Sequence, residues 1–290
     1  MQWITSLLVT LFTAVPVFAD MAFVANLDGN WDLFTVDDDG SHLTRLTKTP
    51  YDEKDPVWSP DRQLIAYLTS DGQLNVIHVV TGKTSRIPTG NRNLRKYSPA
   101  FSPDGKAIVY AQARSGAGDD SDLLLFNFES SRDRLVIDQH SIQMWPAFSP
   151  DGKNIIYANL HCNEACGHFI QELWETTTGG NRARQLLLTN SFCKQPVHSP
   201  DGKTIAYASD REGNFDIWIF DFESNDQPRQ VTTNKNSDES PAWSPDGTKI
   251  AFVSNRSGTF EIWVKNLESG ALKKLTPFGG RKVSCRDVAW

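Results

Sequence analysis

One short motif recurs along this 290-residue chain and constrains its fold more than any other feature. It reads Ser-Pro-Asp-Gly in four copies and Ser-Pro-Asp-Arg in one, starting at residues 59, 102, 149, 199 and 244. Successive copies therefore start 43, 47, 50 and 45 residues apart. A period in this range is typical of a repeat architecture, in which each copy builds one structural unit.

Each copy of the motif specifies a tight turn. Pro sets φ near −65° at the second position, Asp bonds back to the local backbone, and Gly adopts the left-handed conformation that closes the turn. We therefore interpret the repeated carboxylates as turn residues and not as a carboxylate site. They are Asp61, Asp104, Asp151, Asp201 and Asp246.

Strand patterns follow each turn. After the fourth copy, residues 204–208 form an apolar, β-rich run, and residues 215–220 and 228–232 form two more such runs beyond a polar loop. A Pro-x-aromatic lead-in before the turn supplies another strand. Four short antiparallel strands in about 45 residues describe one blade of a β-propeller.

Counting these units predicts six blades. Five complete units begin near Asp55, Tyr97, Met144, Gln195 and Ser240. Residues 21–25, 31–36 and 43–47 match the second, third and fourth strands of a further unit, whose first strand is missing. Residues 287–290 resemble residues 55–58 and can supply that strand. The sequence therefore predicts an all-β, six-bladed propeller with blade one closed by strands from both termini, an arrangement that pairs strand edges that would otherwise be open.

The N-terminal segment predicts export. Residues 1–19 contain no Lys, Arg, Asp or Glu and end in Val17-Phe18-Ala19, which is typical of a signal peptide cleaved after Ala19. The propeller then comprises residues 20–290 and is periplasmic or secreted. The alternative is an uncleaved segment that acts as a membrane anchor. The formal net charge of −6 argues against a nucleic-acid binder.

The consensus Pro-Ala-Trp-Ser-Pro-Asp-Gly-Lys-x-Ile-Ala-Phe-x-Ser-x-Arg-x-Gly-x-x-x-Ile-Trp-Val resembles the propeller repeat of the TolB family. Residues 241–264 show it most clearly. Members of that family are periplasmic proteins of the Tol-Pal envelope system. The resemblance covers the propeller and not the N-terminal α/β domain that the family also carries. It implies a TolB-like six-bladed propeller, and related repeats also occur in peptidase gating domains and in a lyase acting on pectic fragments.

Four cysteines are an even number in a compartment that is expected to be oxidising, so we predict a disulfide among Cys162, Cys166, Cys193 and Cys285, with the pairing left open. The segment 161–168, placed in a loop between the second and third strands of its blade, is the least repeat-like part of the chain. An alternative is a zinc or copper site formed by His161, Cys162, Cys166 and His168. No bound cofactor is predicted.

The chain lacks the sequence signatures of catalysis. No Gly-x-Ser-x-Gly elbow, phosphate-binding glycine-rich loop or His-Glu-x-x-His motif occurs. Aromatic residues precede most Ser-Pro pairs and are expected to fill the space between blades, and His198, which replaces one of them, is interpreted as a hydrogen-bonded packing residue.

The loops that join one blade to the next are expected to surround one mouth of the central channel. Residues 48–55, 89–97, 138–145, 189–195, 233–240 and 277–287 contain ten basic and seven acidic side chains, a net charge of +3 in a chain of −6. This asymmetry favours an acidic partner surface or an anionic glycan. The candidate contact residues are Lys54, Arg92, Arg95, Lys96, Tyr97, Trp145, Phe192, Lys194, Glu239, Arg281, Lys282 and Arg286.

These patterns predict a monomeric, non-catalytic scaffold. The resemblance to the TolB family implies that it binds another envelope protein, such as a peptidoglycan-associated lipoprotein, within a Tol-Pal-like system. The alternative is a carbohydrate-active enzyme or a glycan-binding module with its site at the channel mouth.

Overall fold

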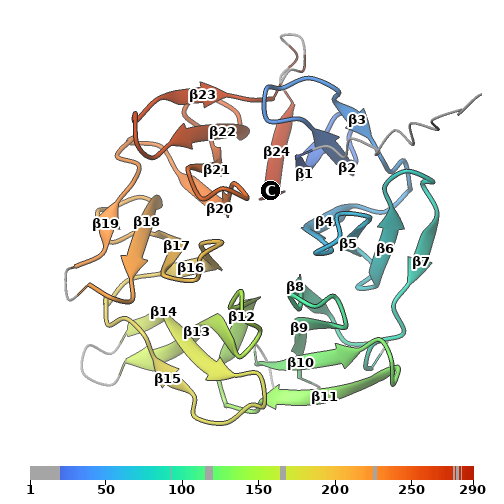
Figure 1. Cartoon of the computed structure of the whole chain (residues 1–290), viewed down its shortest axis with the longest axis vertical. Coiled ribbons are helices and arrows are strands. Elements are labelled where there is room, and N and C mark those ends of the chain that lie inside the picture. The colour runs from blue at the N-terminus through green and yellow to red at the C-terminus, as the bar shows by residue number, and fades with distance from the viewer. Residues whose placement is uncertain are drawn as a thin grey trace, which may run out of the picture.

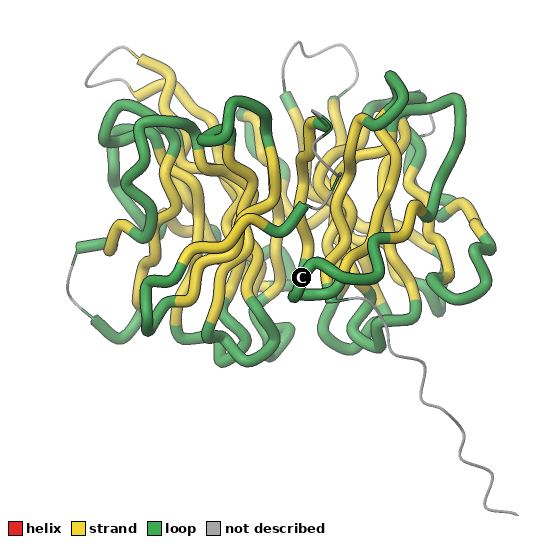
Figure 2. Tube along the Cα trace, turned by 90° about the horizontal axis from the view of Figure 1, so that it is seen from above, coloured by secondary structure: helices red, strands yellow, loops and turns green. Residues whose placement is uncertain are grey.

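The structure is a computed structural model that describes residues 20–91, 93–114, 120–163, 168–224, 227–276, 278, 281 and 283–290, without the side chains of Cys162, Asn163 and His168. Within these residues every regular element is a β-strand and none is a helix. The sheets stand side by side around a central axis (Figure 1), and loops gather at the two opposite ends of the sheets (Figure 2). The chain therefore has the all-β propeller arrangement that the repeat predicts. The predicted signal peptide, residues 1–19, lies outside the described residues.

Four strands form one unit, which we name by its strands. The first unit takes its innermost strand from the end of the chain, in the order β24 (Ser284–Ala289), β1 (Met21–Asn26), β2 (Trp31–Val36) and β3 (Thr44–Arg45). The next contains β4 (Glu53–Trp58), β5 (Leu64–Thr69), β6 (Leu74–His78) and β7 (Thr84–Arg86). The last two are β16 (Cys193–His198), β17 (Thr204–Ser209), β18 (Asp216–Asp221) and β19 (Arg229–Gln230), then β20 (Asp238–Trp243), β21 (Lys249–Ser254), β22 (Glu261–Asn266) and β23 (Leu272–Lys274).

The two units between these share one sheet. They contain β8 (Lys96–Phe101), β9 (Ala107–Ala113), β10 (Ser121–Asn127) and β11 (Arg132–Ile137), then β12 (Ile142–Phe148), β13 (Asn154–Asn163), β14 (His168–Thr177) and β15 (Arg184–Gln185). A parallel bridge between Ser121 and Ile142 joins the two halves. Because the sheets of the described residues then number five, the count of six blades stays a prediction.

The hydrophobic cores lie between neighbouring units. Trp58 and Ile65 pack with Val24 of the first unit, and Phe148 packs with residues of the β8–β11 unit. The second strand of each unit has a run of apolar, buried residues because a neighbouring unit covers each of its faces. Trp58, Phe148 and Trp243 are 7%, 9% and 9% exposed, which confirms the predicted packing role of the aromatic residue before these three Ser-Pro pairs, and the half-buried Phe101 packs against a core as well.

His198 occupies the same position in the β16–β19 unit. Its ring stacks on Phe222 with centroids 5.8 Å apart. The predicted packing role of His198 is confirmed, and among the described residues neither ring nitrogen has a hydrogen-bond partner. Burial lowers the pKa of His198 to about 4, which keeps the ring neutral at physiological pH.

The repeated turns owe their shape to the serine as much as to the aspartate. In each copy the Ser Oγ donates to the Asp Oδ1 over 2.6 Å. The same oxygen of Asp104 accepts the Lys106 amide at 3.0 Å. These bonds hold the pKa of the turn carboxyls below their ordinary value, with the serine bond as the largest cause. The interpretation of these carboxylates as turn residues is confirmed.

The least repeat-like segment differs from its prediction. Strands β13 and β14 are ten residues long, and their pairing continues from His161–Ile170 to Asn163–His168. His161, Cys162 and His168 therefore lie in strands and not in a loop. The extra pairing lengthens this hairpin beyond the six-residue second and third strands of the β16–β19 unit.

Candidate functional site

The inner strands surround a channel, and each of them bends at one equivalent position. When the six inner strands are aligned, three successive positions can be compared. The first position is occupied by Glu53, Lys96, Gln143, Cys193, Asp238 and Cys285. Two residues later the pairing with the next strand shifts register at a β-bulge. The residues at this third position have φ angles between 49° and 54° and are Asp55, Ser98, Trp145, Gln195, Ser240 and Asp287. Positive φ in non-glycine residues costs on the order of 1 to 3 kcal/mol, so the surrounding contacts must hold them.

Three of the six side chains at the third position, those of Asp287, Asp55 and Gln195, bond to the next unit. Asp287 Oδ2 accepts the Asp55 amide at 3.3 Å, and Asp55 Oδ2 accepts the Ser98 amide at 3.0 Å. Gln195 Oε1 accepts the Ser240 amide at 2.9 Å, and Gln195 Nε2 donates to Ser240 Oγ at 2.7 Å. These bonds satisfy amides that the bulges release from the ladder, and they join one unit to the next around the channel.

The junction between β24 and β4 brings two carboxylates together. Burial, and after it the nearby Asp55 carboxylate, raises the pKa of Asp287 to about 7. Arg286 opposes this effect, with its Nε 3.5 Å from Asp287 Oδ2. Near neutral pH this carboxyl group is therefore partly protonated.

The second position of the same strands forms a ring of half-buried side chains nearer the interblade loops. Its members are Lys54, Tyr97, Met144, Lys194, Glu239 and Arg286. Lys54 Nζ lies 5.0 Å from the centre of the Tyr97 ring, and Lys194 Nζ pairs with Glu239 over 2.8 Å. The Arg286 guanidinium stacks 4.2 Å from the centre of the Trp31 ring and donates to the Glu53 carbonyl at 2.8 Å. We call this set the mouth ring.

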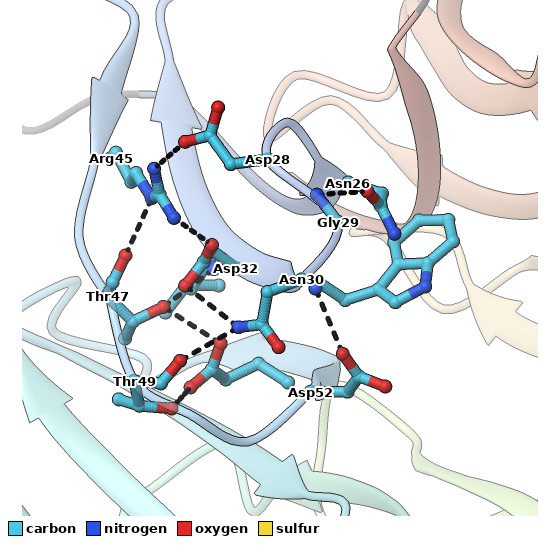
Figure 3. A network of polar contacts seen from close by, with 12 residues as sticks. Asn26, Asp28, Gly29, Asn30, Asp32, Arg45, Thr47, Thr49 and Asp52 are labelled. Carbon is cyan, nitrogen blue, oxygen red and sulfur yellow. Dashed lines mark hydrogen bonds and ion pairs between the residues drawn. The ribbon is translucent and has the colours of Figure 1, made fainter.

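The loops beside the mouth ring are fixed by polar anchors, as Figure 3 shows for residues 47–52. Asn30 Nδ2 donates to the Thr49 and Tyr51 carbonyls at 2.9 and 3.0 Å, and the Trp31 amide donates to Asp52 at 3.1 Å. The loop 233–237 repeats the device. Asn214 Nδ2 donates to the carbonyls of residues 234 and 236, both at 3.0 Å.

Buried acids complete these anchors. Glu53 is fully buried, and its carboxylate accepts the hydroxyls of Thr47 and Thr49 at 3.1 and 2.7 Å. Burial raises the pKa of Glu53, and the nearby Asp32 and Asp52 carboxylates add to the effect. Asp32 is itself buried and forms an ion pair with Arg45. Polar groups that are buried and bonded in this way hold the mouth loops in one arrangement.

The structure brings five predicted contact residues together in the mouth ring, namely Lys54, Tyr97, Lys194, Glu239 and Arg286. Trp145 instead lines the channel, and Phe192, Arg95 and Arg281 are on the loops around it. Arg92 and Lys282 lie outside the described residues.

Lys96 requires a correction, because it is only 1% exposed and is not available to a partner at the mouth. Its Nζ donates to the Asn91 and Leu94 carbonyls at 3.3 and 3.4 Å. It occupies the first, buried position of the aligned inner strands and holds a loop in place.

The disulfide prediction is not supported. Cys193 and Cys285 are both free and buried, and Cys193 packs beside the hydroxyls of Thr189 and Ser209. They occupy the same position of two different inner strands and lie in separate cores, which is why they do not meet. The side chains of Cys162 and Cys166 lie outside the described residues.

Only His161 of the alternative metal ligands has a described side chain. Its Nε2 lies 3.9 Å from the buried Glu172, and its ring packs edge-on against Trp174. In the part of the chain whose side chains are described, no three His, Cys, Asp or Glu side chains form a metal-binding group. Cys162, Cys166 and His168 lie outside that part.

Sequence reasoning missed two aligned series. The first position of the inner strand is at most 1% exposed in all six cases, although four of its residues are polar or charged. The third position lines a cavity of 470 Å³, which continues along the channel to the aromatic residues and prolines of the repeated turns. A position-by-position alignment of the repeats could have revealed the first series, because a polar residue occurs three positions before the Pro of most Pro-x-aromatic motifs.

A family model described as the TolB beta propeller domain matches residues 18–161 and 119–287. The chain belongs to this TolB propeller family. A curated relative, the protein TolB homolog of Chlorobium chlorochromatii, is 28% identical over 109 residues. That match spans 34% of this chain and 25% of the relative's own length.

Two solved structures show how the family fold is shared. TolB from Acinetobacter baumannii superposes with a TM-score of 0.78 at 20% identity, over 93% of this chain and 66% of that one. Oligogalacturonate lyase from Vibrio parahaemolyticus has a TM-score of 0.64 at 14% identity, over 91% of this chain and 77% of the lyase. At these identities the similarity shows the fold alone.

Among the described residues there is no helix with the length and hydropathy needed to cross a bilayer.

Proposed function

We propose that this TolB-like propeller is a non-catalytic scaffold that binds another protein of the cell envelope at the mouth ring. The observation that carries the proposal is the ring itself. Lys54, Lys194 and Arg286 are half-buried cations, each held over an aromatic ring of the same face. Aromatic and cationic side chains that are already ordered are typical of binding hot spots.

The anchored loops strengthen this argument. A surface that is fixed before binding loses little conformational entropy when a partner arrives, so more of its contact energy contributes to affinity. Three cations and one acid in the mouth ring favour an acidic partner surface, which would also accelerate encounter at low ionic strength.

Family membership suggests the partner and the compartment. We infer a periplasmic or secreted monomer, exported by residues 1–19, that acts in a Tol-Pal-like system and binds a peptidoglycan-associated lipoprotein. The TolB homolog and the TolB structure reported above support this inference by name and fold.

We also propose that the ring has six blades, the eight-stranded sheet counting as two. The supporting observation is that each of its halves repeats the four-strand order of the other units and that one bridge joins them. Blade one is then closed by β24, which pairs with β1 between Ala25 and Cys285 and between Ala22 and Ala289. Deletion of residues 286–290 should lower the melting temperature by about 10 °C or more, since it removes a paired strand. An unchanged melt would contradict closure.

Binding should first be sought by mild crosslinking in an envelope fraction, followed by calorimetry with the purified lipoprotein. Charge reversal by Lys54→Glu together with Arg95→Glu is expected to weaken binding at least about tenfold and to reduce its salt dependence. Lys153→Glu is the matched control, because Lys153 is 80% exposed on a repeated turn at the opposite end of the sheets. Equal affinity of both variants would contradict the mouth-ring proposal.

The alternative is a carbohydrate-active enzyme or a glycan-binding module at the same mouth. The fold shared with oligogalacturonate lyase supports this alternative, and the support is limited to the fold. Metal content of the purified protein and turnover of oligosaccharides separate the two: stoichiometric zinc or copper with turnover favours the enzyme, and a bound lipoprotein without either favours the scaffold.

A further inference from the structure

A groove of 720 Å³ opens at the end of the sheets opposite the mouth, between the β8–β11 and β12–β15 units. Its floor is apolar, with Leu125 and Phe148 only 6% and 9% exposed. Lys106, Arg132 and Arg134 lie at its rim and are exposed. We call it the basic groove. Its volume is within the range of small-molecule sites, about 300 to 1,000 Å³.

The acids that border the groove are already engaged. Asp104 and Asp151 accept the serine hydroxyls of their own turns at 2.6 Å, and Asp151 also pairs with Lys153 over 3.2 Å. Asp133 accepts the Tyr110 hydroxyl at 2.6 Å and the Gly90 amide at 2.5 Å. These contacts satisfy the carboxylates within the protein.

Among the described residues, one of the three rim cations is engaged within the protein and two are not. Arg134 donates across the groove to the Thr178 carbonyl at 2.5 Å and so links the two units. In the described part of the chain, neither Lys106 Nζ nor the Arg132 guanidinium makes a hydrogen bond or an ion pair. Arg132 and Arg134 share one face of β11 because alternate residues of a strand point the same way, and Arg134 pairs with the floor residue Leu125. The groove therefore presents donors that are free to bind an anion.

We propose that the basic groove binds a carboxylated saccharide. A lone phosphate or carboxylate would occupy little of its volume. The apolar floor suits the C–H face of a sugar ring, and Asn127, Ser130 and Thr178 provide amide and hydroxyl groups along the walls. Arg132 can bind a carboxylate through two parallel N–H donors. This site is separate from the mouth ring, so the saccharide proposal can be tested independently of the scaffold proposal.

Calorimetry or NMR titration of the full propeller with trigalacturonate tests the proposal. Binding is expected at a Kd of about 1 mM or tighter and should weaken several-fold as salt rises from about 50 to about 300 mM. The methyl ester of the same trisaccharide has the same rings without charge, and it should bind at least about tenfold more weakly. Absence of binding to trigalacturonate, or equal binding of the ester, would overturn the proposal.

Two variants locate the site. Arg132→Gln with Lys106→Gln removes the free donors and should weaken binding at least about tenfold, without affecting the floor. Phe148→Trp with Thr178→Leu should abolish binding by filling the groove with the residues that stand at the equivalent places of the β20–β23 unit. Lys203→Gln with Arg229→Gln removes the same number of cations from the β16–β19 unit, and this control should bind as the parent does.

The remaining outcomes are decisive as well. If the filled variant fails to fold, the Arg132 and Lys106 variant still tests the site, because both side chains are exposed. Unchanged binding in that variant would place the ligand elsewhere and overturn the proposal. Triglutamate that binds as tightly as trigalacturonate would overturn the saccharide specificity and favour an acidic peptide.

Discussion

The basic groove and its counterpart between the β16–β19 and β20–β23 units are built from the same parts, yet their volumes are 720 and 310 Å³. Each lies between two successive Ser-Pro-Asp-Gly turns. Arg134 in one and Arg229 in the other hold the same place, opposite an aliphatic residue of the third strand. The fourth strands of the two units differ in length, since β11 has six residues and β19 has two.

The side chains that the following unit contributes differ as well. The basic groove has Phe148 and Thr178 where the smaller groove has Trp243 and Leu267. Both exchanges place the larger side chain in the smaller groove. The repeat thus conserves the framework, and the junction between two units decides whether a site opens there.

The largest expected effect comes from opening the smaller groove. Trp243→Phe with Leu267→Thr should lower the free energy of unfolding by about 2 to 4 kcal/mol, because Trp243 is 9% exposed and its indole donates to the Val197 carbonyl at 3.3 Å. Urea unfolding measures this loss. The single variants serve as controls for additivity. An unchanged midpoint would mean that these side chains do not set the groove volume.

Charge distinguishes two other junctions, since Gln195 and Ser240 make neutral bonds where Asp287 and Asp55 bring carboxylates together. The raised pKa of Asp287, about 7, means that the folded state keeps a proton that the unfolded chain releases near pH 4. The parent should therefore lose stability as pH rises from about 4 to about 7, relative to Asp287→Asn.

Thermal melts across this pH range test the charge contrast. Asp287→Asn should be more stable than the parent at pH 8 by about 1 to 2 kcal/mol, and the gap should close at about pH 4. Gln195→Ala is the control and should change stability equally at both ends of the range. A gap that does not depend on pH would contradict the raised pKa.

The Ser-Pro-Asp-Gly turns that border the two grooves should contribute equally to stability. Asp151→Ala and Asp246→Ala each remove a carboxylate whose pKa is lowered to about 2, chiefly by the serine hydroxyl. Each should lower the melting temperature by about 2 °C at pH 7. A depressed pKa contributes stability above pH 4 that is lost toward pH 2, so parent and variants should converge there. Unequal losses at pH 7 would show that the two turns are not equivalent.

The smallest effect is expected from filling the basic groove. Phe148→Trp with Thr178→Leu should change the free energy of unfolding by less than about 1 kcal/mol, since burial of added apolar surface offsets any crowding. Differential scanning calorimetry measures it. A loss comparable to that of the opened groove would show that the basic groove cannot accept the larger side chains.

Local chemistry made the turns and strands predictable. Pro, Asp and Gly impose their turn without help from distant residues, and alternating apolar residues identify the strands that follow. Residues 204–208 illustrate this, since the predicted run became β17. The mouth ring was predicted in part for the same reason, because Lys54, Lys194 and Arg286 follow interblade loops whose place in the repeat is known.

Contacts between units were not predictable in this way. The sequence predicted a disulfide among four cysteines, yet the equivalent positions of Cys193 and Cys285 place these two in different cores. Lys96 was predicted to be a cation of the channel mouth, yet its side chain is buried. The sequence by itself determined the repeated turn, the order of the strands and the family. Only the tertiary structure decided which thiols stay free, which cation is buried and which groove opens, because each depends on side chains that separate units bring to one junction.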